Sequence, residues 1–192
     1  MLLFRKVFII YILIFTLLYG LFVKNNRHKY NLIEFFIYYT FGVYISLIIG
    51  ITIFPIPIQP EEIALNIEYN LGLKNNFIPI INTVKNTSLD FKNGIILEPI
   101  IQVLGNLILF IPIGFYLPFF RRNICFKKVF FIALSSTILI ELTQGIINLI
   151  VGYNYRSVDV DDIILNLLGA ILGYYLFKFL YPKFRALLDK KD

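Results

Sequence analysis

The sequence predicts an all-α membrane protein, a polytopic bundle of about five transmembrane helices, from three observations. Hydrophobic residues make up 58% of the 192 residues, whereas soluble domains hold roughly 45–50% even with glycine counted. Charged residues amount to only 16%, against about 25% in soluble domains, and the mean hydropathy is +0.77. The apolar residues also gather in runs of ~20, the length that a helix needs to cross a bilayer.

Five apolar runs divide the chain: residues 7–23, 32–54, 99–120, 129–151 and 162–181. The first follows Arg5 and Lys6 and therefore has a signal-peptide alternative, which requires a cleavage site of small residues. Residues 24–27 are instead Lys-Asn-Asn-Arg. We therefore expect four core spans plus an uncleaved N-terminal span.

This pattern predicts three parts. Residues 1–31 are expected to form the N-terminal helix with a basic loop, residues 32–182 the main membrane domain, and residues 183–192 a basic tail. Inside the main domain, residues 55–98 form a polar segment. It is longer than most loops, which indicates a function or a structure of its own.

Clusters of lysine and arginine predict how the bundle is oriented. They lie between runs one and two, between runs three and four, and after run five. With five spans these clusters fall on one side of the membrane, which the positive-inside rule assigns to the cytoplasm. The C-terminus is then cytoplasmic, and residues 55–98 and 152–161 face outward.

Run four carries a carboxylate, Glu141, close to the middle of the membrane. An ionisable side chain there costs at least ~2.5–3.5 kcal/mol, so it usually faces protein and has a function. Thr137, Gln144 and Asn148 share its helix face, because the four residues are spaced four, three and four apart. This stripe is predicted to face the bundle interior or a wet cavity.

Two other runs repeat this design. Run five places Asp162, Asn166, Gly169 and Gly173 on one face, and small residues four apart let helices approach closely. Run three adds Gln102 and Asn106, again four apart. Three helices thus bring polar groups to the outer half of the membrane. We expect a polar pocket that opens outward and narrows toward Glu141.

The loop before run five contributes Arg156 and Asp159, which form either a simple ion pair or part of the site. The candidate binding residues are Asn106, Glu141, Gln144, Arg156, Asp159, Asp162 and Asn166. These side chains could instead have a purely structural role. Asparagine and glutamine hold membrane helices together at ~0.6–2 kcal/mol per contact, and aspartates cap helix starts.

Several segments resemble the signature of VanZ-like membrane proteins. They are residues 106–114 (Asn-Leu-Ile-Leu-Phe-Ile-Pro-Ile-Gly), 141–144 (Glu-Leu-Thr-Gln) and 156–173, with weaker matches at 52–55 and 76–79. The resemblance spans roughly residues 40–176. It implies a bacterial cytoplasmic-membrane protein linked to resistance against glycopeptide antibiotics, notably teicoplanin. It does not imply a reaction.

Three functions remain open. In the first, the pocket binds an amphiphile, which is an antibiotic with an acyl chain, a cell-wall lipid precursor or a phospholipid headgroup, with Arg156 as a bidentate donor. In the second, Glu141 and Asp162 serve as general acid and base of an intramembrane enzyme. In the third, a buried carboxylate couples transport to protons, although no inverted repeat is visible. We favour binding over catalysis, so no catalytic residue is assigned.

Composition also narrows the partners. His28 and Cys125 are the only histidine and cysteine, which makes a metal site improbable, and no cofactor is predicted. Basic residues lie between apolar runs instead of on one solvated face, which argues against nucleic acid. Membrane lipids are the expected partners, and the sequence does not indicate an oligomeric state.

Overall fold

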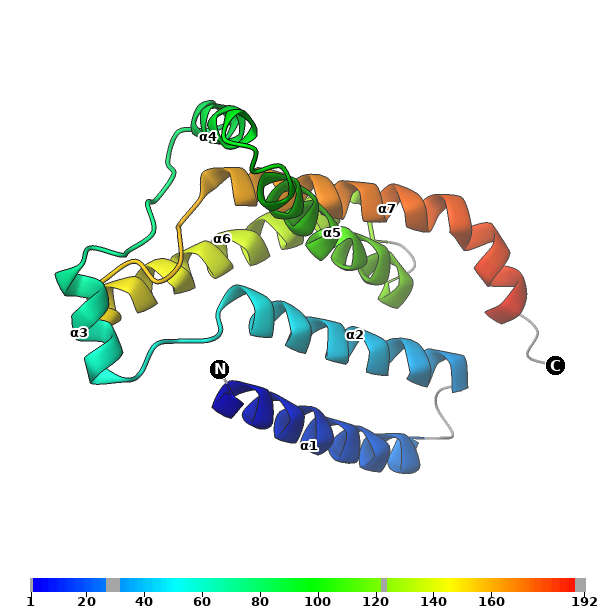
Figure 1. Cartoon of the computed structure of the whole chain (residues 1–192). Coiled ribbons are helices and arrows are strands. Elements are labelled where there is room, and N and C mark those ends of the chain that lie inside the picture. The colour runs from blue at the N-terminus through cyan, green and yellow to red at the C-terminus, as the bar shows by residue number, and fades with distance from the viewer. Residues whose placement is uncertain (1, 27–31, 122–123, 189–192) are drawn as a thin grey trace. The chain divides into compact units, whose positions relative to one another are not determined.

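The computed structural model describes residues 2–26, 32–121 and 124–188 (Figure 1). Within these ranges it contains helices and no strands, which confirms the all-α prediction. The elements are α1 (Leu2–Asn26), α2 (Leu32–Thr52), α3 (Pro60–Glu68), α4 (Ile81–Lys92), α5 (Leu97–Phe120), α6 (Phe126–Val151) and α7 (Val160–Leu188).

Four helices are long and apolar enough to cross a membrane, namely α2, α5, α6 and α7. The N-terminal helix has a shorter apolar stretch, Ile12–Asn25. The expected four core spans and a distinct N-terminal helix are thus confirmed. Parts of the basic clusters lie outside the described residues, namely residues 27–29, which include His28, together with Arg122 and residues 189–192.

The chain divides into two compact units, and α1 and α2 belong to the first. These two helices pack through aromatic side chains: the rings of Tyr19 and Tyr39 lie 5.4 Å apart, and the Tyr19 hydroxyl donates to the Phe35 carbonyl. Thr16 Oγ1 lies 2.9 Å from the Tyr39 hydroxyl. Tyrosine hydroxyls and aromatic faces therefore hold this pair together.

The second unit, residues 56–182, contains the remaining spans. Its α5 and α7 approach each other at three glycines, Gly114 on α5 and Gly169 and Gly173 on α7. A Cβ atom built on any of them would lie 1.9–2.0 Å from a main-chain carbonyl oxygen of the facing helix. No side chain fits at that distance. The sequence expectation of close approach at Gly169 and Gly173 is therefore correct.

Helix α6 joins this pair through small and aromatic residues. Phe110, Val129, Ala133 and Ala170, from α5, α6 and α7, are at most 1% exposed, and the rings of Phe126 and Tyr174 lie 5.4 Å apart. The opposite faces carry exposed leucine and isoleucine, as a lipid-facing surface requires. Helix α6 ends at Gly152, whose φ of +90° gives a left-handed C-cap.

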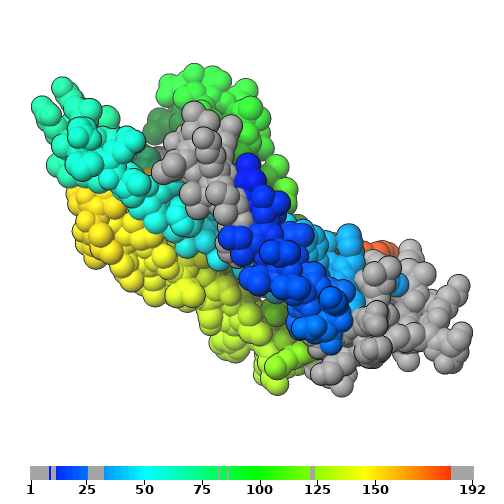
Figure 2. Space-filling view, turned by 90° about the horizontal axis from the view of Figure 1, so that it is seen from below, coloured from blue at the N-terminus to red at the C-terminus, as the bar shows by residue number. Residues whose placement is uncertain are grey.

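The long polar segment has the structure of its own that its length indicated. It forms α3 and α4, joined by a non-helical stretch, before α5 begins. Helix α3 starts with Pro60 in its first turn, followed by Glu61 and Glu62, which complement the positive end of a helix. Figure 2 shows α3 beside the C-terminal end of α6, where Ile67 lies near Gly152.

Candidate ligand-binding site

The site is built where two non-helical segments run side by side. Residues 73–76, between α3 and α4, pair in parallel with residues 154–160, which run from the loop after α6 to the first residue of α7 (Figure 1). Leu73 N donates to Asn154 O at 2.8 Å, Asn76 N to Val158 O at 2.9 Å, and Val160 N to Asn76 O at 2.9 Å. These bonds fix the polar segment against the start of α7.

The buried amide of Asn76 strengthens this pairing. Its Nδ2 donates to Asp159 Oδ1 at 2.8 Å and to Asp161 Oδ2 at 3.1 Å. Asp159 Oδ1 also accepts the Asp161 N–H at 2.8 Å. One neutral side chain therefore holds two carboxylates that would otherwise repel each other at the N-terminus of α7.

Asp161 extends the connection to α4. Its Oδ1 accepts the Ile80 N–H at 2.7 Å, and its Oδ2 accepts the Thr83 hydroxyl. Ile80 has a φ of +66° and a ψ of −44°, and Ile81 N donates to Pro79 O at 2.7 Å. This geometry is a classic γ-turn, which is rare and strained for a β-branched residue. Asp161 stabilises it at the point where α4 begins.

The polar stripe of α6 lies inside the protein, as predicted: Thr137, Glu141, Gln144 and Asn148 are all buried. Glu141 Oε2 accepts the Asp159 N–H at 2.8 Å. Asn148 Nδ2 donates to Arg156 O at 2.8 Å, and Arg156 N donates back to Asn148 Oδ1 at 3.4 Å. The stripe thus anchors the main chain of the loop between α6 and α7.

Deeper in the bundle, amides connect the spans to one another. Asn106 on α5 donates to Asp162 Oδ1 on α7. Asn166 on α7 donates through Nδ2 to the Thr137 hydroxyl on α6 at 3.0 Å. Polar groups on three spans thus lie at matching depths, where Asn106 meets Asp162 and Asn166 meets Thr137 on a neighbouring helix.

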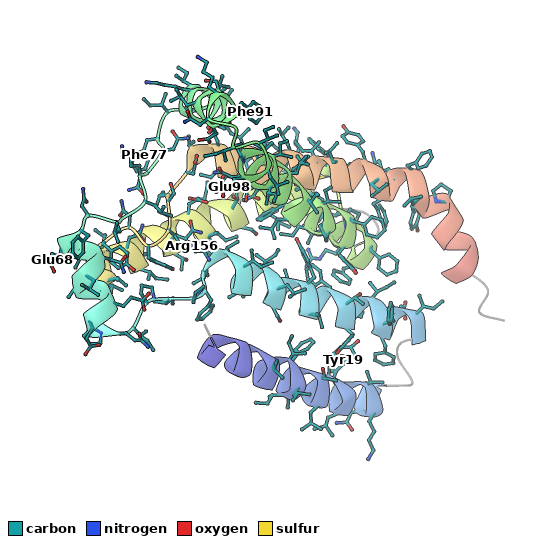
Figure 3. All side chains as sticks on the ribbon, in the orientation of Figure 1. Tyr19, Glu68, Phe77, Phe91, Glu98 and Arg156 are labelled. Carbon is teal, nitrogen blue, oxygen red and sulfur yellow. The ribbon has the colours of Figure 1, made fainter. Side chains whose placement is uncertain are left out.

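A pocket of about 680 Å³ opens between these segments. Four segments form its walls: residues 73–76, helix α4, the start of α5 and the loop before α7. The lining residues are Leu73, Lys74, Asn75, Asn76, Thr83, Thr87, Asp90, Glu98, Pro99, Gln102, Ser157 and Asp159. Figure 3 marks Glu98 at the start of α5 and places Phe77 and Phe91 on two of the surrounding segments.

The pocket is lined by more acidic than basic side chains, with three carboxylates and one lysine. Asp159 is 7% exposed. Burial raises the pKa of its carboxyl, and hydrogen bonds from the Asp161 N–H and the Asn76 amide oppose that rise. Within the residues that the structure describes, no group of histidine, cysteine, aspartate and glutamate is arranged to hold a metal ion.

The family model for VanZ/LLP1 matches residues 41–181, most of the chain. The chain belongs to the VanZ/LLP1 family. No curated protein and no solved structure gave a match. The matched range agrees closely with the roughly 40–176 expected from the sequence.

The VanZ-like motifs coincide with the contacts that assemble the site. The segment at 106–114 begins with Asn106, which binds Asp162, and ends with Gly114, which packs against α7. The segment at 141–144 contains Glu141, which holds the Asp159 N–H. The weaker match at 76–79 begins with Asn76, which carries the pairing of the two segments. Residues of these motifs therefore join the spans to one another and fix the loops on them.

Two pairs of the predicted site residues are in contact, but the seven residues do not share one wall. Glu141 pairs with Asp159, and Asn106 with Asp162. Gln144 and Asn166 are buried, and Arg156 is half-buried on the loop (Figure 3). Of the seven, Asp159 lines the pocket.

Sequence reasoning missed the α4 wall of the pocket. Thr83, Thr87 and Asp90 line it, and their spacing of four and three puts them on one helix face. The same spacing revealed the stripes on runs four and five. Residues 81–92 carry no apolar run that marks them as a helix, so this spacing is not evident within the polar segment 55–98. In the sequence, Asn76 stands out only as one of the polar residues of segment 55–98 and as the start of the weak family match at 76–79.

A test of the loop anchor compares two substitutions of Glu141. Glu141→Ala leaves the buried Asp159 N–H without its acceptor, so we expect a loss of about 1–3 kcal/mol in the free energy of unfolding. Glu141→Gln keeps an acceptor oxygen and should lose less. Reversible unfolding in mixed micelles measures both, with the exposed Leu142→Ala as control. Equal stability of the alanine variant and the wild type would contradict the anchor.

Proposed function

We propose that this VanZ/LLP1 chain binds a cell-envelope amphiphile in the pocket between α4, α5 and the loop before α7, and thereby contributes to resistance against teicoplanin-type glycopeptides. The observation that carries the proposal is the pocket itself, a cavity of about 680 Å³ lined by convergent polar side chains. Concave sites with a few fixed polar groups are the usual places for small ligands. The glycopeptide link comes from the VanZ-like resemblance.

The proposal places the chain in a bacterial cytoplasmic membrane, with the pocket outside and the C-terminus in the cytoplasm. The lysine and arginine clusters of the sequence support this orientation, since with five spans they fall on the membrane side opposite to residues 55–98 and 152–161. A glycopeptide or a lipid-linked precursor in the outer leaflet could then reach the pocket without crossing the membrane.

Binding is favoured over catalysis by what the acidic residues contact. Glu141 accepts a main-chain N–H and Asp162 accepts an amide of Asn106. Neither residue lines the pocket. These contacts hold the structure together, whereas a general acid or base must reach the substrate.

The test fills the pocket without disturbing the fold. Thr87→Trp places a large side chain into the pocket from α4, and Ser88→Trp places the same side chain on the exposed face of that helix. We expect Thr87→Trp to return teicoplanin susceptibility to that of cells without the protein, and Ser88→Trp to leave resistance intact. Membrane levels are checked by immunoblotting.

Unchanged resistance in Thr87→Trp at normal membrane levels would refute the pocket as the site. Arg156→Ala tests the sequence-predicted donor separately. If Arg156 meets a phosphate or carboxylate of the ligand, this variant loses resistance while it still inserts at normal levels. Retained resistance would remove Arg156 from the site and leave the pocket residues as its binding groups.

A further inference from the structure

The charged groups that line the pocket are not neutralised by one another. Lys74 comes from the paired segment, Asp90 from α4 and Glu98 from the first turn of α5. Among the described residues, the side chains of these three make no hydrogen bond or ion pair. Asp159, in contrast, is already held by Asn76 and the Asp161 N–H. Three charges therefore remain available to a ligand.

The arrangement of these charges specifies a ligand that carries both signs. Lys74 is the single cation of the pocket and suits an anionic group of the ligand. Asp90 and Glu98 suit a cationic group. Because carboxylates outnumber the lysine, a purely anionic headgroup meets net repulsion in the pocket. Thr87 and Gln102 add neutral donors and acceptors beside the charges.

The position of the pocket at the end of a membrane-spanning helix indicates an amphiphilic ligand. Glu98, Pro99 and Gln102 lie in the first turns of a membrane-spanning helix, where its polar end meets its apolar body. On that helix Ile101 and Leu104 are 58% and 47% exposed. A headgroup in the pocket would thus leave its acyl chain along an apolar helix face, at the level where lipid headgroups lie.

We propose that the pocket selects the zwitterionic headgroup of an amphiphile, with a primary ammonium at Asp90 and Glu98 and a phosphate or carboxylate at Lys74. This inference rests on the proposed function and names its ligand class. Two sources share this chemistry: a phosphatidylethanolamine-type lipid and an amine-bearing glycopeptide. Phosphatidylcholine lacks the N–H donors, and phosphatidylglycerol lacks the cation.

The experiment titrates the full chain in detergent with short-chain phosphatidylethanolamine, phosphatidylcholine, phosphatidylglycerol and teicoplanin by calorimetry. We expect binding of phosphatidylethanolamine or teicoplanin, and at least about tenfold weaker binding of the other two lipids, as for loss of one charge-assisted hydrogen bond. Whichever of the two ammonium ligands binds identifies the source.

Charge variants locate the selectivity. Asp90→Asn with Glu98→Gln should weaken the ammonium ligand about tenfold or more and remove its advantage over phosphatidylglycerol. Lys74→Gln should weaken binding of the zwitterionic ligand without increasing the affinity for phosphatidylcholine. Glu61→Gln with Glu62→Gln, exposed carboxylates on α3 that do not line the pocket, is the matched control and should change nothing.

The outcomes separate this inference from the proposed function. Measurable binding of all three lipids with equal affinity, or a preference for phosphatidylglycerol, overturns the headgroup inference, while resistance lost in Thr87→Trp would still support an amphiphile site. Selective binding that the double carboxylate variant does not alter also overturns it. No binding of any tested amphiphile by the wild type overturns both.

Discussion

Replacing Asp161 by alanine is expected to release α4 and the segment before it from the start of α7. The substitution removes the acceptor of the Ile80 N–H, the Thr83 hydroxyl and one bond of the Asn76 amide. A buried donor left unpaired costs ~1–3 kcal/mol. Since two of these donors are only partly buried, we expect a total loss of about 2–4 kcal/mol.

Hydrogen exchange measured by mass spectrometry checks this prediction locally. In Asp161→Ala, the amides of residues 76–92 should exchange much faster, while those of α5 and α6 stay protected. Asp161→Asn keeps one acceptor oxygen and should show a smaller change. Asp90→Ala is the control, because Asp90 lines the pocket without bonding to α7. Unchanged exchange in α4 would show that other contacts position it.

Substituting Gly173 by alanine is the second large effect that we expect. Its added Cβ would lie 1.9 Å from Ile111 O on α5, and the nearest atoms belong to main chain, which cannot rotate away. The helices must separate, and overpacking of this kind costs about 1–3 kcal/mol or more. Reversible unfolding in mixed micelles should show the loss.

Gly105→Ala is the matched control for this substitution. It adds the same methyl group to a glycine of α5, but nothing lies within 4 Å of the new Cβ. Because alanine favours a helix over glycine by about 1 kcal/mol in water, this variant should be neutral or slightly more stable. If Gly173→Ala and Gly105→Ala behave alike, close contact of α5 and α7 is not important for stability.

The spans and their buried faces could be predicted because they depend on local pattern. Length and hydropathy located α2, α5, α6 and α7, and helical spacing showed that Glu141 and Asn148 share an inward face. A polar group in an apolar solvent must meet protein. That requirement acts on each helix separately, so the sequence of each helix reveals it.

The pairing of distant segments could not be predicted in this way. Asn76 and Asp159 are 83 residues apart, and neither belongs to a periodic pattern that involves the other. Their contact depends on where α3 and α4 return the chain. For the same reason the sequence predicts a pocket that narrows toward Glu141, whereas the cavity of about 680 Å³ lies between α4 and the start of α5.

The sequence by itself thus determined a membrane bundle of the VanZ/LLP1 family with polar groups on three spans. The helical period is sufficient for this prediction, because each turn of a span places the same faces toward lipid and toward protein. Only the tertiary structure decided how those groups are used. Glu141, Asn148 and Asp161 meet main-chain atoms of other segments, and long-range hydrogen bonds have no local signature. Those bonds leave Lys74, Asp90 and Glu98 facing the pocket.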